Sequence, residues 1–143
     1  MKPDVAVFVA STPLNALLCC ALASQVEGSK LLLLIDQENH LAANQLALLS
    51  ELEGELIDKV HLVGCKNKGI KGFFNKKKAL KTTTDLLTGR SVRQLFMCND
   101  RRIENQYLIK QTLRDGGQVT YVDDGWYTYS GKQWRHNKVI DYL

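Results

Sequence analysis

Two adjacent carboxylates follow the last run of strand-forming residues in the chain. Asp123 and Asp124 are followed by Gly125 and by the aromatic residues Trp126 and Tyr127. Consecutive residues of an extended segment point to opposite sides, so one acid can face a cleft while the other braces the loop. A general base must be held within about 3 Å of the proton that it removes. The residue types therefore indicate a base and a supporting carboxylate beside an aromatic platform for a sugar or ring. The alternative is a plain turn with packed aromatic residues, because Asp and Gly also favour turns.

Polar side chains follow two other predicted strands. Ser11, Thr12 and Asn15 come directly after the first, and Asn99 and Arg101 come directly after the fourth. The first group offers hydrogen bonds to the hydroxyls of an acceptor, and a guanidinium suits an acidic sugar. The alternatives are a helix cap by Ser11 or Thr12 and a solvated arginine at a helix start.

Five short runs of aliphatic and β-branched residues predict strands. They lie at Asp4–Ala10, Lys30–Ile35, Leu56–Val63, Val92–Cys98 and Gln118–Val122. The second run is apolar without alternation, which is typical of a strand covered on both faces.

Helical patterns fill the gaps between these runs. The first predicted helix starts at Pro13, and its apolar residues recur at helical spacing: Leu14, Leu17, Leu18, Ala21 and Leu22. Further helices are predicted from Leu41 to Leu52, from Phe73 to Leu87 and from Ile103 to Leu113, and a last one starts near Gln133. Gly54 and the Gly116-Gly117 pair supply stop signals after the second and fourth of these helices.

The alternation of strands and helices predicts an α/β fold. We expect a Rossmann-like three-layer sandwich with a five-stranded parallel sheet of order 3-2-1-4-5 and helices on both faces. Ligands of such sheets bind beyond the carboxyl ends of the strands, near the point where the strand order reverses. The loops that carry Ser11, Asn99 and Asp124 all belong at that edge, so the fold predicts one site there.

Several kinds of site are excluded by the loops. The turn after the first strand, Ala10 to Asn15, has no glycine, whereas a dinucleotide site needs G-x-G-x-x-G at this point. The stretch Gly64 to Lys71 fails as a P-loop because Ile70 stands where the lysine must be. The cysteines form no C-x-x-C pair and no histidines cluster, so we expect no metal and no cofactor in this chain.

Length and composition indicate one domain that spans residues 1–143. The chain is 45% hydrophobic and 24% charged, which are ordinary globular values. Asp4 lies inside the would-be apolar stretch of the N-terminus, so no signal peptide is predicted, and no window is apolar enough to span a membrane. Unpaired cysteines indicate a reducing compartment. We expect a cytoplasmic protein, with a peripheral position at the inner membrane as an option.

Two segments carry a resemblance to a known family. They are Phe8–Leu18, F-V-A-S-T-P-L-N-A-L-L, and Tyr121–Tyr129, Y-V-D-D-G-W-Y-T-Y. Their order and spacing on a five-strand pattern resemble the N-terminal half of the bacterial sialyltransferases, above all the lipooligosaccharide sialyltransferase and capsule polysialyltransferase groups. Those enzymes have a GT-B architecture, with two Rossmann-like domains that face each other across a cleft.

The resemblance implies an activity and roles for the acidic residues. Asp124 would be the general base that deprotonates the hydroxyl of a cell-surface glycan acceptor, and Asp123 would support it. Inverting attack on the anomeric carbon of CMP-sialic acid would follow. Asn15 stands where relatives often carry glutamine.

One departure from the family pattern concerns the donor. A His-Pro pair binds the CMP phosphate in the family's C-terminal domain, but neither His40, His61 nor His136 is followed by proline. We therefore expect the acceptor-side domain alone, with the nucleotide-sugar domain absent. The alternatives are a truncated gene product and a relative that has lost donor binding. By itself the chain should not transfer sugar efficiently.

A basic run provides a second hypothesis from a different class. Between Lys66 and Lys81 there are seven lysines and no acid. The run is a solvated helix face, a guide for an anionic glycan, or a contact with an anionic membrane surface through Phe73 and Phe74. Nucleic acid is not expected as a partner because interleaved stacking aromatics are missing. The alternative function is a non-catalytic Rossmann-like module that binds an anionic ligand or partner through this segment.

Overall fold

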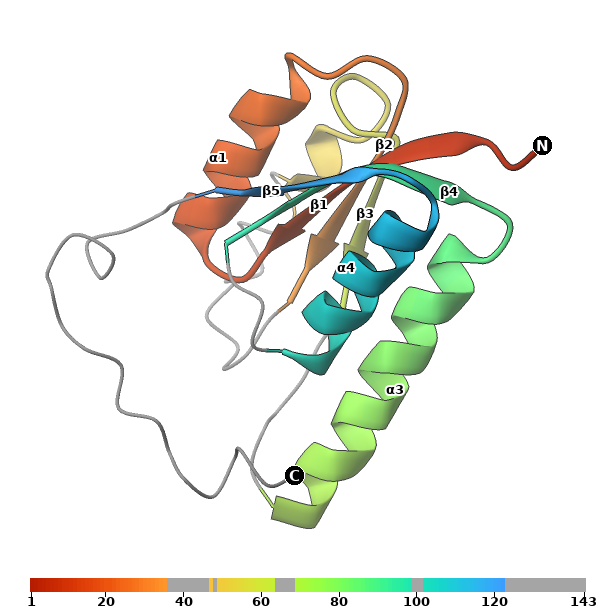
Figure 1. Ribbon diagram of the computed structural model, residues 1–143. Helices are drawn as coiled ribbons and strands as arrows, with labels where there is room; N and C mark the ends of the chain where they lie inside the picture. Colours follow the sequence, from red (N-terminus) through yellow and green to blue (C-terminus); the bar gives the residue numbers. More distant parts are fainter. Residues whose placement is uncertain (36–46, 48, 64–68, 99–101, 123–143) are drawn as a thin grey trace, which may run out of the picture.

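A computed structural model describes residues 1–35, 47, 49–63, 69–98 and 102–122 of the 143-residue chain. The described residues form an α/β fold with one sheet and helices on both of its faces (Figure 1). This confirms the predicted fold class.

The sheet is five-stranded, with the order β3-β2-β1-β4-β5, and every pair of neighbouring strands is parallel. The strands are β1 (Asp4–Ala10), β2 (Ser29–Leu34), β3 (Lys59–Leu62), β4 (Ser91–Met97) and β5 (Gln118–Tyr121). The predicted strand order 3-2-1-4-5 is therefore confirmed. The largest boundary difference is at β3, which is half as long as the predicted run from Leu56 to Val63, since Ile57 is only an isolated bridge partner of Glu53.

Two hydrophobic cores lie on the two faces of the sheet. Alternate residues of β1 point to opposite sides, so Val5, Val7 and Val9 join one core while Ala6 and Phe8 join the other. All five are at most 5% exposed, because β1 is the central strand and both of its faces are covered. The continuous apolar character of this strand follows from that position.

Three helices of the described residues cover the faces. α1 (Pro13–Ala23) packs on the face that carries Phe8, and α3 (Gly69–Leu87) and α4 (Ile103–Arg114) pack on the face that carries Val7 (Figure 1). Phe8 also stacks on Phe96 of β4, with ring centroids 4.7 Å apart and planes 4° apart. Of the predicted helix from Leu41 to Leu52, residues 47 and 49–51 are described and helical; the predicted helix near Gln133 lies outside the described residues.

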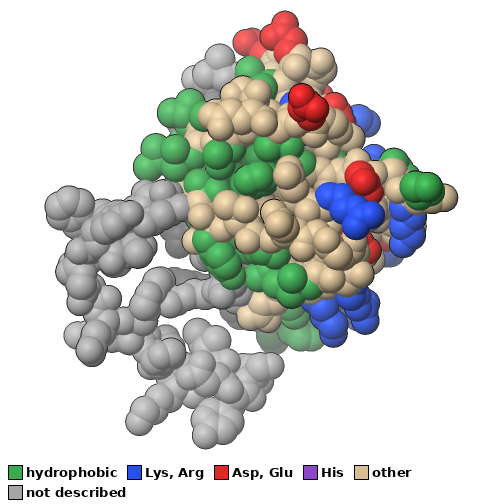
Figure 2. Space-filling view, turned by 45° about the horizontal axis from the view of Figure 1, so that its top comes forward, with side chains coloured by type: hydrophobic (Ala, Val, Ile, Leu, Met, Phe, Trp, Pro, Cys, Tyr) green, Lys and Arg blue, Asp and Glu red, His purple; other side chains and the backbone are tan. Residues whose placement is uncertain are grey.

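The buried face of α1 is not the predicted stripe of large apolar residues. Leu14 and Leu17 are 52% and 67% exposed, whereas the helix buries Asn15, Ala16, Cys19, Cys20 and Ala23 against the sheet. Small side chains let the helix lie close to the strands. Figure 2 shows hydrophobic side chains gathered on the side of the molecule that carries α1 in Figure 1.

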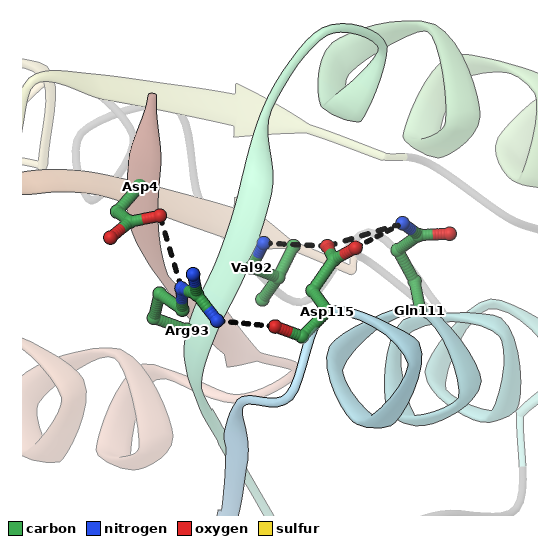
Figure 3. A network of polar contacts seen from close by, with 5 residues as sticks. All are labelled: Asp4, Val92, Arg93, Gln111 and Asp115. Carbon is green, nitrogen blue, oxygen red and sulfur yellow. Dashed lines mark hydrogen bonds and ion pairs between the residues drawn. The ribbon is translucent and has the colours of Figure 1, made fainter. Parts of the chain in front are cut away.

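A polar network joins the end of α4 to the start of β4, at the amino edge of the sheet (Figure 3). The Asp115 carboxylate accepts from the backbone N–H of Val92 at 2.8 Å and from Nε2 of Gln111 at 3.2 Å. Arg93 donates to the carbonyl oxygen of Asp115 and pairs with Asp4 at 3.1 Å. The network orients the tight turn between α4 and β5.

Glycines make this turn possible. Gly116 has φ of 71°, a left-handed conformation that side chains disfavour. At Gly117 a Cβ would collide with the carbonyl groups of Val92 and Arg93, so the chain passes β4 too closely for a side chain. The stop signal predicted at these glycines is therefore confirmed as the end of α4.

None of the helices in the described part of the chain is both long and apolar enough to cross a bilayer.

Candidate functional site

The carboxyl ends of β1, β4 and β5 lie side by side at one edge of the sheet. β1 is bonded to both β2 and β4, and the strand order reverses between them. The backbone N–H of Val122 donates to the carbonyl oxygen of Met97 at 2.7 Å, so the chain leaves β5 beside the end of β4. This edge is where ligands of open parallel sheets bind.

The turn after β1 is tied to the end of β4 by three side chains. Oδ1 of Asn15 accepts from Oγ of Ser11 at 3.2 Å and from Sγ of Cys98 at 3.2 Å. Sγ of Cys98 also lies 3.8 Å from Oγ of Ser11. Asn15 is only 2% exposed, so its amide is a buried link between α1 and β4 rather than an open group. The Ser11 hydroxyl is half-buried and faces the same junction.

Thr12 is the N-cap of α1. Its Oγ1 accepts from the backbone N–H of Asn15 at 3.1 Å, and its backbone is extended, with φ of −134° and ψ of 161°. Pro13 follows as the first helical residue, where its missing N–H costs nothing. The capping interpretation of Thr12 is therefore confirmed. The residue is also exposed to solvent at the carboxyl edge of the sheet.

A buried thiol, Cys19, also belongs to α1. Burial, followed by the neighbouring Cys98 and Cys20 thiols, raises the pKa of Cys19 to about 12. Its Sγ donates to the carbonyl oxygen of Val9 at 3.8 Å. Because the thiolate is the reactive form, Cys19 behaves as a small core residue.

An arginine that the sequence interpretation passed over lies at the start of α4. Nη2 of Arg102 pairs with Oε1 of Glu104 at 3.2 Å, and the two side chains are 9% and 1% exposed. Nε and Nη1 of Arg102 are buried, and neither has a hydrogen-bond partner among the described residues. A buried guanidinium with unused donors is a candidate contact for an anion at this edge. The sequence interpretation chose the neighbouring Arg101, which lies outside the described residues.

The other predicted site residues lie outside the described residues. They are Asn99, Arg101, Asp123, Asp124, Gly125, Trp126 and Tyr127. Asp123 is the residue after Val122, the last described residue of the chain, and Asn99 is the residue after Cys98.

A hollow in the described part of the molecule lies at the opposite edge of the sheet. It measures about 560 Å³ and opens at the amino edge of the sheet, between the loop after α1 and the starts of β1, β4 and β5. Its lining includes Asp4, Glu27 and Arg93, and it lacks a convergent set of groups of one chemistry. Because parallel sheets bind ligands at the opposite edge, we do not assign the site to this hollow.

Metal and histidine chemistry find no support in the described residues. No group of three His, Cys, Asp or Glu side chains there could hold a metal ion. His61 lies in β3, and burial, together with Lys59 and Arg90, lowers its pKa, so it is neutral at pH 7. This agrees with its prediction as a strand residue.

Comparison of the chain with protein-family models, curated proteins and solved structures found no match in any of the three.

Proposed function

We propose that the chain is the acceptor-side domain of a sialyltransferase-like glycosyltransferase of GT-B architecture. Asp124 acts as the general base, and Asp123 supports it. The acceptor is a cell-surface glycan, and the donor, CMP-sialic acid, binds to the second, nucleotide-sugar domain of the GT-B architecture. The proposal includes a cytoplasmic position, where the nucleotide sugar is available.

The reaction is a single displacement. The acceptor oxygen forms a bond to the anomeric carbon of sialic acid while the bond from that carbon to the phosphate oxygen of CMP breaks. The acceptor proton passes to the Asp124 carboxylate, and the configuration at the anomeric carbon inverts. Gly125, Trp126 and Tyr127 line the acceptor side. Arg102 supplies a guanidinium for the carboxylate of an acidic sugar, the role that the sequence interpretation gave to Arg101.

One observation carries the proposal. The turn with Ser11 and Asn15 is bonded to Cys98 at the end of β4, and Val122, which precedes Asp123, is bonded to Met97 on the same strand. The first segment of the family resemblance and the described start of the second, Tyr121 and Val122, are more than 100 residues apart and are both bonded to the end of β4 at one edge of the sheet.

The test uses the complete native protein with CMP-sialic acid and a sialylated oligosaccharide acceptor. Asp124→Asn keeps the shape of the side chain but removes its basicity, so kcat should fall by about 10² to 10⁴, with little change in the acceptor KM. The matched control is Asp85→Asn, an exposed acid of α3. Normal turnover by the Asp124→Asn variant would remove the assignment of the base.

A second candidate function is a non-catalytic module that binds an anionic ligand or partner. It is favoured by five exposed lysines of α3, at positions 71, 76, 77, 78 and 81. The native reading frame distinguishes the two functions. An enzyme requires continuation into a domain with a His-Pro pair, whereas a module that stops after Leu143 and binds anions without transfer supports the second function.

A further inference from the structure

The outer surface of α3 differs from its buried surface in both hydrophobicity and charge. Residues 72, 79, 83 and 87 face the core, and Ala79 and Thr83 are at most 3% exposed. At 100° per residue, Ile70, Phe74, Lys77 and Lys81 lie on the opposite side of the helix. The helix therefore has one face fixed in the fold and one face available to another molecule.

Three large apolar side chains project from the first turns of this helix. Ile70 is 81% exposed, Phe73 66% and Phe74 63%. The two phenylalanine rings touch edge to face, with centroids 5.8 Å apart. Isolated exposed hydrophobic residues are ordinary, but three within five positions form a patch that water disfavours.

Lysines surround this patch. Lys71, Lys76, Lys77, Lys78 and Lys81 are all exposed, and none forms an ion pair with a described residue. The first turn of α3 has no acidic residue, although the helix dipole favours acids there. The charges of this segment therefore do not stabilise the start of its own helix, but they suit contact with an external anionic surface.

The position of α3 makes the patch reachable. At 1.5 Å per residue its 19 residues span about 28 Å, against about 18 Å for the 12 residues of α4. Figure 1 shows the first turns of α3 beyond the end of the neighbouring α4, on the outside of the helical layer. Because α3 begins after β3, these turns lie at the carboxyl edge of the sheet, the edge of the Ser11–Asn15 turn.

We propose that the first half of α3 docks the protein on the surface of an anionic lipid bilayer. Ile70, Phe73 and Phe74 insert at the boundary between headgroups and acyl chains, and the lysines contact the anionic headgroups. A dissolved polyanion would use the lysines but has no apolar phase for the three hydrophobic side chains, which is why a bilayer fits better. Docking of this kind turns the carboxyl edge of the sheet toward the membrane. The inference does not depend on the proposed enzymatic function.

The test is flotation of the full chain with phosphatidylcholine vesicles that contain or lack phosphatidylglycerol. We expect binding only to the vesicles with phosphatidylglycerol, and weaker binding as salt is raised. Phe73→Ala/Phe74→Ala should lower the partition coefficient at least about tenfold, because apolar burial is lost while every charge remains. Lys77→Gln/Lys81→Gln should lower it by about fivefold per lysine.

Matched controls come from α4. Leu113 is 62% exposed and Lys110 is exposed, so Leu113→Ala and Lys110→Gln remove the same chemistry from outside the patch and should leave binding unchanged. Alanine is a better helix former than phenylalanine, and the substituted residues are exposed, so the fold should survive; circular dichroism verifies this.

Two outcomes would overturn the proposal. One is equal flotation with and without phosphatidylglycerol. The other is full vesicle binding by Phe73→Ala/Phe74→Ala together with loss in the lysine variant, which would identify a purely electrostatic site for polyanions. Displacement from the vesicles by soluble polysialic acid, unaffected by the phenylalanine substitutions, would point to the same polyanion site.

Discussion

At the scale of single residues, Asn15 explains how the candidate edge is held together. One amide oxygen accepts from Ser11 and from Cys98, two residues 87 positions apart in the sequence. Since the amide is 2% exposed, loss of these bonds would leave a buried polar group, which costs more than the bonds contribute. The neighbouring Thr12 is exposed, so its hydroxyl combines a cap with a position at the edge.

Thr12 provides a test that separates capping from substrate binding. Thr12→Ala should lower the free energy of unfolding by about 1 kcal/mol, because the N–H of Asn15 loses its acceptor, whereas Thr12→Ser should have little effect. Urea denaturation of the two variants measures this difference. An unchanged midpoint for Thr12→Ala would show that the cap contributes nothing, and a loss of acceptor binding in both variants would favour a contact through the methyl group.

At the scale of elements, the sequence predicted the strands better than the orientation of α1. The core strands are continuous apolar runs between glycines and helix caps, so their existence and order follow from local patterns. The helix P-L-N-A-L-L-C-C-A-L-A is apolar on every side, and its periodicity does not select a face. Tertiary contacts determine which face of α1 is buried. The small residues and Asn15 pack against the sheet, and Leu14 and Leu17 are exposed to solvent.

The candidate site was only partly predictable for a related reason. The sequence placed Ser11 and Asn15 at the correct edge, since the carboxyl ends of parallel strands meet there. It gave no sign that Asn15 would be buried, because the contact of Asn15 with Cys98 depends on packing between distant segments. The Arg102–Glu104 pair is local, but its burial also depends on how α4 packs in the fold. The prediction for Asp123 and Asp124 stays a prediction, as both lie outside the described residues.

The link between α4 and β4 predicts a pH dependence of stability. The hydrogen bond from the Val92 N–H, with that from Gln111, holds the pKa of Asp115 below its ordinary value of 3.8. The folded state therefore favours the carboxylate, and the stabilisation is fully present above pH 3.8 and is lost as pH falls through the lower pKa of the folded protein.

Asp115→Asn should remove this dependence. We expect the wild-type protein to be more stable than the variant by about 1 kcal/mol near neutral pH, because a hydrogen bond to a charged acceptor is weakened in a partly solvated position. The difference should shrink as pH falls below 3.8. Urea midpoints across this range measure it, with Asp85→Asn as the control. A constant difference at all pH values would show that Asp115 acts only by its shape.

At the scale of the whole molecule, stability should fall from the centre of the sheet to its edges. β1 lies between β2 and β4, and its residues from Val5 to Ala10 are at most 5% exposed. β5 is an edge strand in which Gln118, Thr120 and Tyr121 are exposed and Val119 is half-buried. Strands buried on both faces open only with the whole domain, whereas a short edge strand can open alone.

Amide hydrogen exchange tests this gradient. The amides of Val7 and Phe8 should exchange with the free energy of global unfolding measured in urea, and those of β5 should exchange at least about tenfold faster with little dependence on urea. Leu95→Ala, which opens a cavity at a fully buried position of β4, should reduce the protection of Val7 by its full effect on stability, about 2 to 5 kcal/mol. The same variant should leave β5 nearly unchanged. Equal protection of β5 and β1 would contradict the gradient and would show that β5 unfolds only with the core, which requires a covering contact beyond those of the described residues.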